Sequence, residues 1–222
     1  MKKLITEHDV MKIYQSGVRV IPFTSDVIFT PSAKDKIKQL GLKISKMEEA
    51  SRIETIENPI EEIDKSKIAA IGSDHTGFKL KNFAAKILSD HGYSIIDVGT
   101  YDENACDYPD FAFAAAKKVK NKEASFGIII DATGNPSAIT ANKLPGIRAA
   151  NCYNEFTAKS AREHNNANVL TLGAKSIGEE TTRSIIETWL KTNFAGGRHQ
   201  KRLDKISGIE RQIFGNINTE EK

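Results

Sequence analysis

The residues between Phe126 and Arg148 carry the pattern with the most chemical promise. Asp131 ends the apolar run 127–131, and Thr133 and Gly134 follow it in a turn before a predicted helix. A carboxylate at the carboxyl end of a buried strand lies where open α/β sheets bind ligands. The N–H groups of such a turn can hold a developing oxyanion, while Asp131 can accept a proton from carbon. The alternative is that Asp131 caps the following helix, and residue types alone do not choose.

A second pattern follows the first predicted strand of the main domain. Asp74 and His75 come directly after the apolar run 68–72, and Gly77 gives the backbone room to turn into a helix. The spacing is not that of a dinucleotide-binding glycine loop, so that class of cofactor site is not indicated. Asp74 could act on a ligand, or it could cap the helix beside an incidental histidine.

Two further patterns contain the remaining imidazole and guanidinium candidates. His164 lies at the predicted end of a helix, where the helix dipole stabilises its protonated form. Arg198 and Arg202 are four residues apart, so they share a helix face and could grip a phosphate. The alternatives are a surface histidine at a helix end and a solvated basic helix end.

Short β-branched runs alternate with helical patterns from Lys67 onward, and this order must position those side chains. Runs of about five residues suit strands buried on both faces, and the alternation predicts a doubly wound, five-stranded parallel sheet. The expected strands are 68–72, 94–99, 127–131, 147–152 and 168–173. The expected helices are 78–91, 108–120, 137–143, 156–164, 179–192 and about 202–214.

The first 66 residues have a different character. Residues 7–15 predict a short helix, 18–21 a strand, and Thr30-Pro31 the start of a helix that ends at Gly41. Residues 47–65 are charge-dense and poor in large apolar side chains, which suits a linker. We therefore predict a small α+β appendage over 1–46, a linker over 47–66, and the main domain over 67–222.

Composition excludes several classes of function. The 222 residues carry a net charge of only +3, and no basic stripe with interleaved aromatic residues argues for nucleic acid. Cys106 and Cys152 have no metal-ligand spacing, so no metal site and a reducing compartment are expected. No apolar run approaches membrane-spanning length, and the opening residues turn acidic too soon for a signal peptide. We therefore expect a cytoplasmic protein without membrane contact.

Taken together, the motifs resemble one known family. The ordered series SDHTGFKLK, DVGTY, DYPDFA, ANKLPGIRAA, AREHNNANVL and GGRHQKR is similar to ribose-5-phosphate isomerase type B, whose family includes galactose-6-phosphate isomerase subunits. The resemblance spans about residues 67–209. It implies a Rossmann-like subunit in a homodimer or tetramer with shared active sites. It also implies interconversion of an aldose phosphate and a ketose phosphate without a metal or cofactor.

The resemblance also implies residue roles. His164 matches the histidine that opens the sugar ring, and Thr133 and Gly134 lie in the enediolate-binding loop. Asp74 and Tyr108 match substrate-contacting positions, and Asn165 matches a residue that binds sugar hydroxyls. His75, Arg198 and Arg202 match phosphate-region positions, with both arginines expected from the partner subunit, and Lys175 is a further substrate-binding candidate. Lys175 stands where many family members have arginine, so this chain keeps the positive charge but lacks the planar guanidinium group.

The reaction-centre loop departs from the family pattern. The family commonly has Cys-Gly-Thr-Gly-x-Gly, and its cysteine removes the substrate proton, whereas this chain has Asp-Ala-Thr-Gly-Asn-Pro from Asp131. Some members use a glutamate a few residues later, but residues 135–138 contain no acid. Three interpretations stay open: an isomerase with Asp131 as base, an isomerase with a shifted substrate, and a protein that binds sugar phosphate, or scaffolds, without isomerising.

The first 45 residues lie outside this resemblance. They are similar to the leading segment of some proteins of ethanolamine-utilisation and related bacterial microcompartments, including a cobalamin adenosyltransferase. This similarity implies a recruitment module with shell or enzyme partners, and hence a location inside a microcompartment. The alternative is a small appendage that packs on the isomerase domain.

Overall fold

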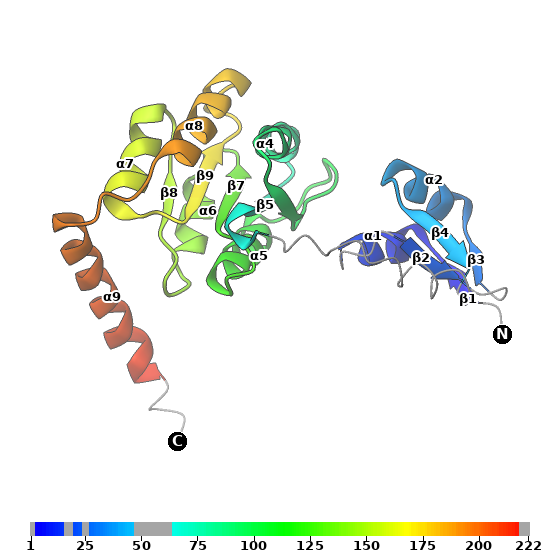
Figure 1. Cartoon of the computed structure of the whole chain (residues 1–222), viewed down its shortest axis with the longest axis horizontal. Helices are drawn as coiled ribbons and strands as arrows, with labels where there is room; N and C mark the ends of the chain where they lie inside the picture. The colour runs from blue at the N-terminus through cyan, green and yellow to red at the C-terminus, as the bar shows by residue number, and fades with distance from the viewer. Residues whose placement is uncertain (1–2, 16–19, 24–26, 47–63, 218–222) are drawn as a thin grey trace. The chain divides into compact units, whose positions relative to one another are not determined.

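The computed structural model describes residues 3–15, 20–23, 27–46 and 64–217. Backbone contacts divide the chain into two compact units, residues 1–63 and 64–222. The predicted linker over 47–66 lies almost entirely outside the described residues. Figure 1 labels the helices and strands of both units.

The N-terminal unit is built from two successive β-α-β segments. Strand β1 (Lys3–Ile5) pairs in parallel with β3 (Val27–Phe29), and β2 (Val20–Phe23) pairs in parallel with β4 (Lys43–Lys46). The helices are α1 (Glu7–Gln15) and α2 (Pro31–Gln39). The unit's buried side chains are Val10, Ile21, Ala33, Ile37 and Leu42.

Two features of this unit bear on the sequence predictions. Thr30 caps α2 as predicted, because its hydroxyl accepts a hydrogen bond from Ala33 N at 3.2 Å. The strands β1, β3 and β4 were not predicted, since three or four residues give too short a pattern to detect.

The C-terminal unit contains a five-stranded parallel sheet in the order β6-β5-β7-β9-β8. This confirms the predicted α/β fold. The strands are β5 (Ile68–Ser73), β6 (Ser94–Asp97), β7 (Phe126–Asp131), β8 (Ala149–Asn151) and β9 (Val169–Gly173). The helices are α4 (Phe78–Asp90), α5 (Tyr108–Lys120), α6 (Asn135–Ala141), α7 (Glu155–Asn165), α8 (Glu179–Lys191) and α9 (Arg198–Ile217), and η1 (Lys65–Lys67) precedes β5.

Alternate residues of the central strand supply two separate cores. Ile128 and Ile130 pack under α4, α7 and α8, whereas Ile129 packs under α5 and α6. Side chains alternate across a strand, and each buried isoleucine stabilises the fold by about 1.5–3 kcal/mol. The helices therefore cover both faces of the sheet. Functional residues can lie at the carboxyl ends of the strands, called the carboxyl edge below, or at their amino ends, called the amino edge.

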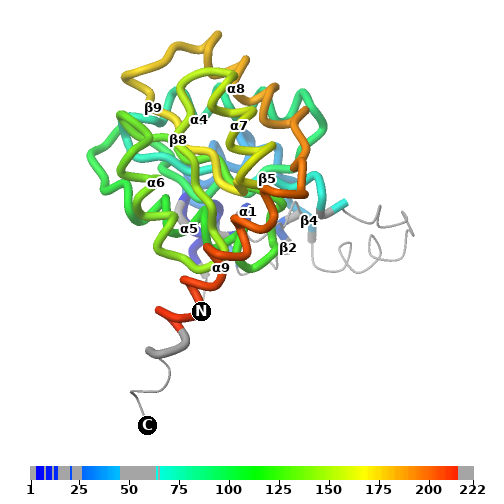
Figure 2. The backbone as a smooth tube through the Cα atoms, turned by 90° about the vertical axis from the view of Figure 1, so that its left-hand side faces the viewer, coloured from blue at the N-terminus to red at the C-terminus, as the bar shows by residue number. Residues whose placement is uncertain are grey.

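The last helix differs from its prediction. α9 begins at Arg198 instead of about residue 202, so Arg198 and His199 lie in its first turn. Figures 1 and 2 show that α9 runs outward from the rest of the unit. Ile206, Ile209 and Ile213 are exposed along it.

Candidate active site

The carboxyl ends of β5 and β7 hold two buried aspartates. Asp74 follows β5, and its Oδ1 accepts hydrogen bonds from Thr76 N at 2.9 Å, Thr76 Oγ1 at 2.6 Å and Gly77 N at 3.0 Å. Asp74 N in turn donates to the carbonyl of Ile130 at 3.2 Å. Asp74 therefore orders the turn before α4 through one oxygen, whereas the helix itself begins at Phe78 without a side-chain cap.

Asp131 makes a denser set of contacts. Its Oδ1 accepts from Thr133 N at 2.8 Å and Gly134 N at 2.6 Å, and its Oδ2 accepts from Ser137 N at 3.0 Å. The residue is 1% exposed. The N–H groups that the sequence suggested for an oxyanion are thus bound by the chain's own carboxylate. This is the geometry of the capping alternative, and the role of Asp131 as a base stays a prediction.

A residue of β8, which is separated from β7 by β9 in the sheet, holds the Asp131 loop in place. Gly134 has φ +79°, and a Cβ there would meet Asn151 Oδ1. Asn151 Nδ2 donates to the carbonyl of Thr133 at 3.2 Å and to Asn135 Oδ1 at 2.8 Å. Sequence reasoning missed Asn151, because its spacing from the loop carries no local signal.

A buried ammonium group, also missed, fixes the loop that leads to Tyr108. Lys81 Nζ donates to both oxygens of Asp97 and to the carbonyl of Thr100, each at 2.7 Å, and its side chain is 1% exposed. Thr100 N donates to the carbonyl of Ser73 at 2.8 Å. A lysine on the apolar face of a predicted helix is the signal that could have found this cluster.

The other predicted residues of this edge lie around the same loops. His75 Nδ1 is 3.2 Å from both N and O of Cys106, just before α5. Tyr108 begins α5 and is partly exposed. Lys175 N donates to the carbonyl of Ala132 at 3.0 Å. The carboxyl edge thus brings together Asp74, His75, Tyr108, Asp131, Thr133, Gly134 and Lys175.

The remaining candidates lie at the opposite edge of the sheet. α7 ends at Asn165, just before the amino end of β9, and Asn168 O accepts from Gly127 N at the amino end of β7. Strands of five or six residues at about 3.3 Å each separate the two edges by about 15–20 Å. His164 and Asn165 therefore do not approach Asp131 within one chain.

At the amino edge, His164 lies against the start of α9. Its ring stacks on that of His199, with centroids 4.4 Å apart and planes 9° apart. His164 Nδ1 is 3.2 Å from Ser160 Oγ. Burial, and then the positive charges of His164, Arg198 and Arg202, lower the pKa of His199, although Glu163 opposes them. The amino edge thus brings together His164, Asn165, Arg198 and Arg202. The family resemblance implied a position in the partner subunit for the two arginines alone.

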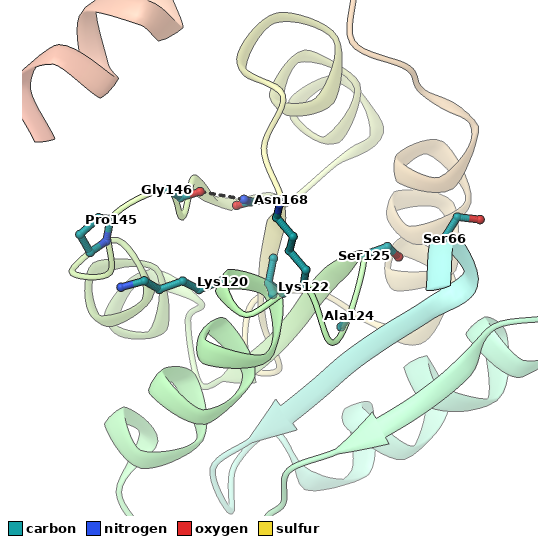
Figure 3. Close-up of a pocket in the computed structure, with 9 residues that line it drawn as sticks. Ser66, Lys120, Lys122, Ala124, Ser125, Pro145, Gly146 and Asn168 are labelled. Atoms are coloured by element: carbon teal, nitrogen blue, oxygen red, sulfur yellow. Dashed lines mark hydrogen bonds between the residues drawn. The ribbon is translucent and has the colours of Figure 1, made fainter. Parts of the chain in front are cut away.

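Two hollows in the C-terminal unit also lie at the amino edge. One, of about 550 Å³, is lined by the residues drawn in Figure 3, including Ser66, Lys120, Lys122 and Asn168. The other, of about 610 Å³, lies between α9 and the segment 142–150. Neither includes a predicted residue of the carboxyl edge.

The described ranges contain neither a cluster of metal ligands nor a helix that could span a membrane. No group of three histidine, cysteine or acidic side chains there could hold a metal ion. No helix in the same ranges is long and apolar enough to cross a bilayer.

Comparison with known proteins assigns the family. Residues 69–206 match the Ribose/Galactose Isomerase family. Ribose-5-phosphate isomerase B of Escherichia coli is 40% identical over 146 residues, which cover 66% of this chain and 98% of the relative.

Solved structures agree with this assignment. The chain is similar to ribose-5-phosphate isomerase B of Clostridium thermocellum, with 46% identity, a TM-score of 0.65, and coverage of 66% of this chain and 99% of the other. It is also similar to the Mycoplasma genitalium enzyme with bound ribulose-5-phosphate, with 42% identity, a TM-score of 0.62, and coverage of 65% and 96%. The chain therefore belongs to the Ribose/Galactose Isomerase family.

Proposed function

We propose that the chain is a sugar-phosphate aldose–ketose isomerase that acts through a cis-enediolate. Its substrate pair is ribose 5-phosphate and ribulose 5-phosphate or a close relative. The observation that carries this proposal is a buried carboxylate, Asp131, at the carboxyl end of β7, beside the end of β5 that leads to Asp74. Family membership supplies the reaction class.

The reaction requires a proton to move between two carbons. Asp131 removes the proton from C2 of the open-chain aldose and returns it to C1, while the hydroxyl proton on O2 passes to O1. The intermediate carries negative charge on oxygen, and the exposed hydroxyl of Thr133 donates to it, because the N–H groups of Thr133 and Gly134 are already bound to Asp131 Oδ1. Asp131 Oδ2 accepts only one backbone hydrogen bond, from Ser137, so one lone pair is left for the substrate proton.

The remaining candidate residues fall into two groups, one at the carboxyl edge of the sheet and one at the amino edge. Asp74 and Tyr108 contact sugar hydroxyls, while His75 and Lys175 contact the phosphate region. His164 opens the ring, Asn165 binds a hydroxyl, and Arg198 and Arg202 bind the phosphate. Because these two groups lie at opposite edges, a complete site combines the carboxyl edge of one chain with the amino edge of a second. A homodimer or tetramer meets this requirement.

A second candidate function rests on the contacts of Asp131 itself. Three backbone N–H groups hold its carboxylate, and the residue is 1% exposed. An acid held in this way orders its loop without chemistry. The chain would then bind sugar phosphate, or act as a scaffold, without isomerising it.

Labelling in deuterated water separates these functions and identifies the substrate. The protein is incubated with four-, five- and six-carbon aldose and ketose phosphates, and deuterium at C1 and C2 is measured by NMR. An isomerase exchanges one carbon length much faster than the others. Saturable binding without exchange of any substrate would establish the binding function instead.

The N-terminal unit supports a separate role as a recruitment module. It has its own buried core, and contacts divide it from the isomerase unit. We expect it to bind a shell or enzyme partner of a bacterial microcompartment, within the cytoplasm. Deletion of residues 1–63 should abolish co-purification with such particles and leave isomerase turnover unchanged. Loss of turnover would favour the alternative, an appendage that packs on the isomerase domain.

A further inference from the structure

The end of α7 carries two predicted substrate residues, so its position matters for chemistry. α7 ends at Asn165, and Asn166 follows in the left-handed conformation, with φ +44°. The last carbonyl groups of a helix have no partner within the helix and need donors from elsewhere. His164 cannot be placed accurately unless this end is held.

Arg148, just before β8, supplies those donors. Its Nε lies 3.1 Å from Asn165 O and 3.0 Å from Asn166 O, and its Nη2 donates to Asn166 O at 2.8 Å. Its Nη1 lies 3.4 Å from Gly146 O. A positive charge at this place also complements the negative end of the helix dipole.

The backbone of Arg148 is held as firmly as its side chain. Arg148 N donates to Asn168 Oδ1 at 2.8 Å, and Asn168 Nδ2 donates to Gly146 O at 2.9 Å. Burial lowers the pKa of Arg148, and Glu210 opposes this, but a guanidinium stays charged at neutral pH. Arg162 makes one separate bond to the helix end, from Nη1 to Ala167 O at 2.7 Å.

We infer that Arg148 is a positioning residue for the half-site formed by His164 and Asn165. It acts through the end of α7, and it sets the orientation in which His164 meets the sugar ring. This role rests on the proposed function of His164. Removal of Arg148 leaves the bond from Arg162, so we expect the helix to persist with its last turn displaced.

The first test uses Arg148→Ala and rescue by guanidinium. Arg148 lines the hollow beside α9, so a small cation can enter the space that the side chain leaves. The variant should convert ribose 5-phosphate at least tenfold more slowly, while exchange of the C1 hydrogen at saturating ketose, which needs no ring opening, stays within twofold. Millimolar guanidinium chloride should restore much of the conversion, and sodium chloride should not.

Two further variants sharpen this test. Arg148→Lys should recover little conversion, because a single ammonium group cannot reproduce the planar fork. Arg183→Ala removes an arginine that packs over Phe83 on another part of the unit and should convert substrate normally. Equal losses of conversion and exchange in Arg148→Ala, or no rescue, would overturn the inference.

A second readout does not depend on turnover. In Arg148→Ala, the amides of Asn166 and Ala167 should exchange faster with deuterated water, and the ring NMR signals of His164 should shift as its stack with His199 changes. Guanidinium should reverse both effects. Unchanged amide protection and unchanged His164 signals would refute the positioning role. If wild-type protein exchanges no substrate, the proposed function fails, and these two signals still decide whether Arg148 positions α7.

Discussion

The carboxylate of Asp131 and the peptide groups of its own loop form one hydrogen-bonded unit at the end of β7. The sequence placed an acid at this point and left two roles open, because a base and a helix cap require the same residue at the same position. The structure shows which N–H groups donate to each carboxylate oxygen of Asp131, and the periodicity of the sequence contains no such information. Asn151 and Lys81 escaped prediction for the same reason, since their partners are distant in sequence.

Replacement of Asp131 should destabilise the protein whatever its catalytic role. Asp131→Ala leaves the N–H groups of Gly134 and Ser137 buried without a partner, and such losses cost about 2 kcal/mol. Urea unfolding measures this cost. Asp102→Ala removes one exposed backbone contact, to Asn104, and serves as the control, with a change of about 0.5 kcal/mol or less. Equal midpoints for the two variants would contradict the cap.

His199 should make stability depend on pH. Its pKa lies below the ordinary value of 6.5, mainly because of burial and then because of His164, so the folded protein favours the neutral ring. As pH falls through 6.5, the unfolded chain takes up this proton first, and the free energy of unfolding therefore decreases. His199→Phe keeps an aromatic ring against His164 and cannot titrate.

Thermal unfolding of the wild type and His199→Phe between pH 8 and pH 5 measures this effect. The wild type should lose more stability than the variant on acidification. A wild type that loses less would show that His199 favours its charged form in the folded protein.

At the scale of elements, helices and strands with a sustained apolar pattern were predictable from the sequence. Very short strands and helix starts made of polar residues were not. α5 spans the residues that its apolar spacing predicted, 108–120. The sequence predicted the start of α9 at about residue 202 and missed its first turn, because Arg198, His199 and Gln200 show no apolar periodicity. His199 in its first turn stacks on His164, a contact between distant residues that no local pattern encodes.

Gly77 allows the turn before α4 to lie directly against the backbone of β7. A Cβ at this position would contact the carbonyl oxygen of Ile130 and lie 2.8 Å from its carbonyl carbon, so Gly77→Ala must push two backbones apart. We expect a loss of about 2–3 kcal/mol in urea unfolding and slower conversion, because Asp74 lies in the same turn. Gly208→Ala, within α9, meets only Arg211 Nη2 at 4.0 Å and should not destabilise the protein, because alanine favours a helix more than glycine does.

At the scale of the whole molecule, the candidate residues divide between the two edges of one sheet. The sequence named the residues of both groups, and the crossover topology divides them, because α7 runs antiparallel to the strands and ends at the amino edge while β7 ends at the carboxyl edge. Under the proposed function, a site that combines both groups needs two chains. The exposed apolar side chains of α9 lie beside the amino-edge group.

Complementation between inactive variants tests this arrangement. Asp74→Asn disables the carboxyl edge and His164→Ala the amino edge, so each variant alone should be nearly inactive on ribose 5-phosphate. Equal mixing with subunit exchange should restore about a quarter of wild-type turnover, because half of the dimers are hybrids with one intact site each. No recovery, despite hybrids detected by mass spectrometry, would place both residues in one chain's site.

The proposed reaction depends above all on Asp131, which carries the proton in an isomerase that lacks the usual cysteine. The most direct measurement is deuterium incorporation at C1 of ribulose 5-phosphate and C2 of ribose 5-phosphate, in deuterated water, by the wild type, Asp131→Asn and Asp131→Cys. The wild type should incorporate deuterium, Asp131→Asn should fall at least a hundredfold, and Asp131→Cys should retain exchange. Wild-type incorporation by folded Asp131→Asn would contradict the claim, as would exchange that appears only in Asp131→Cys.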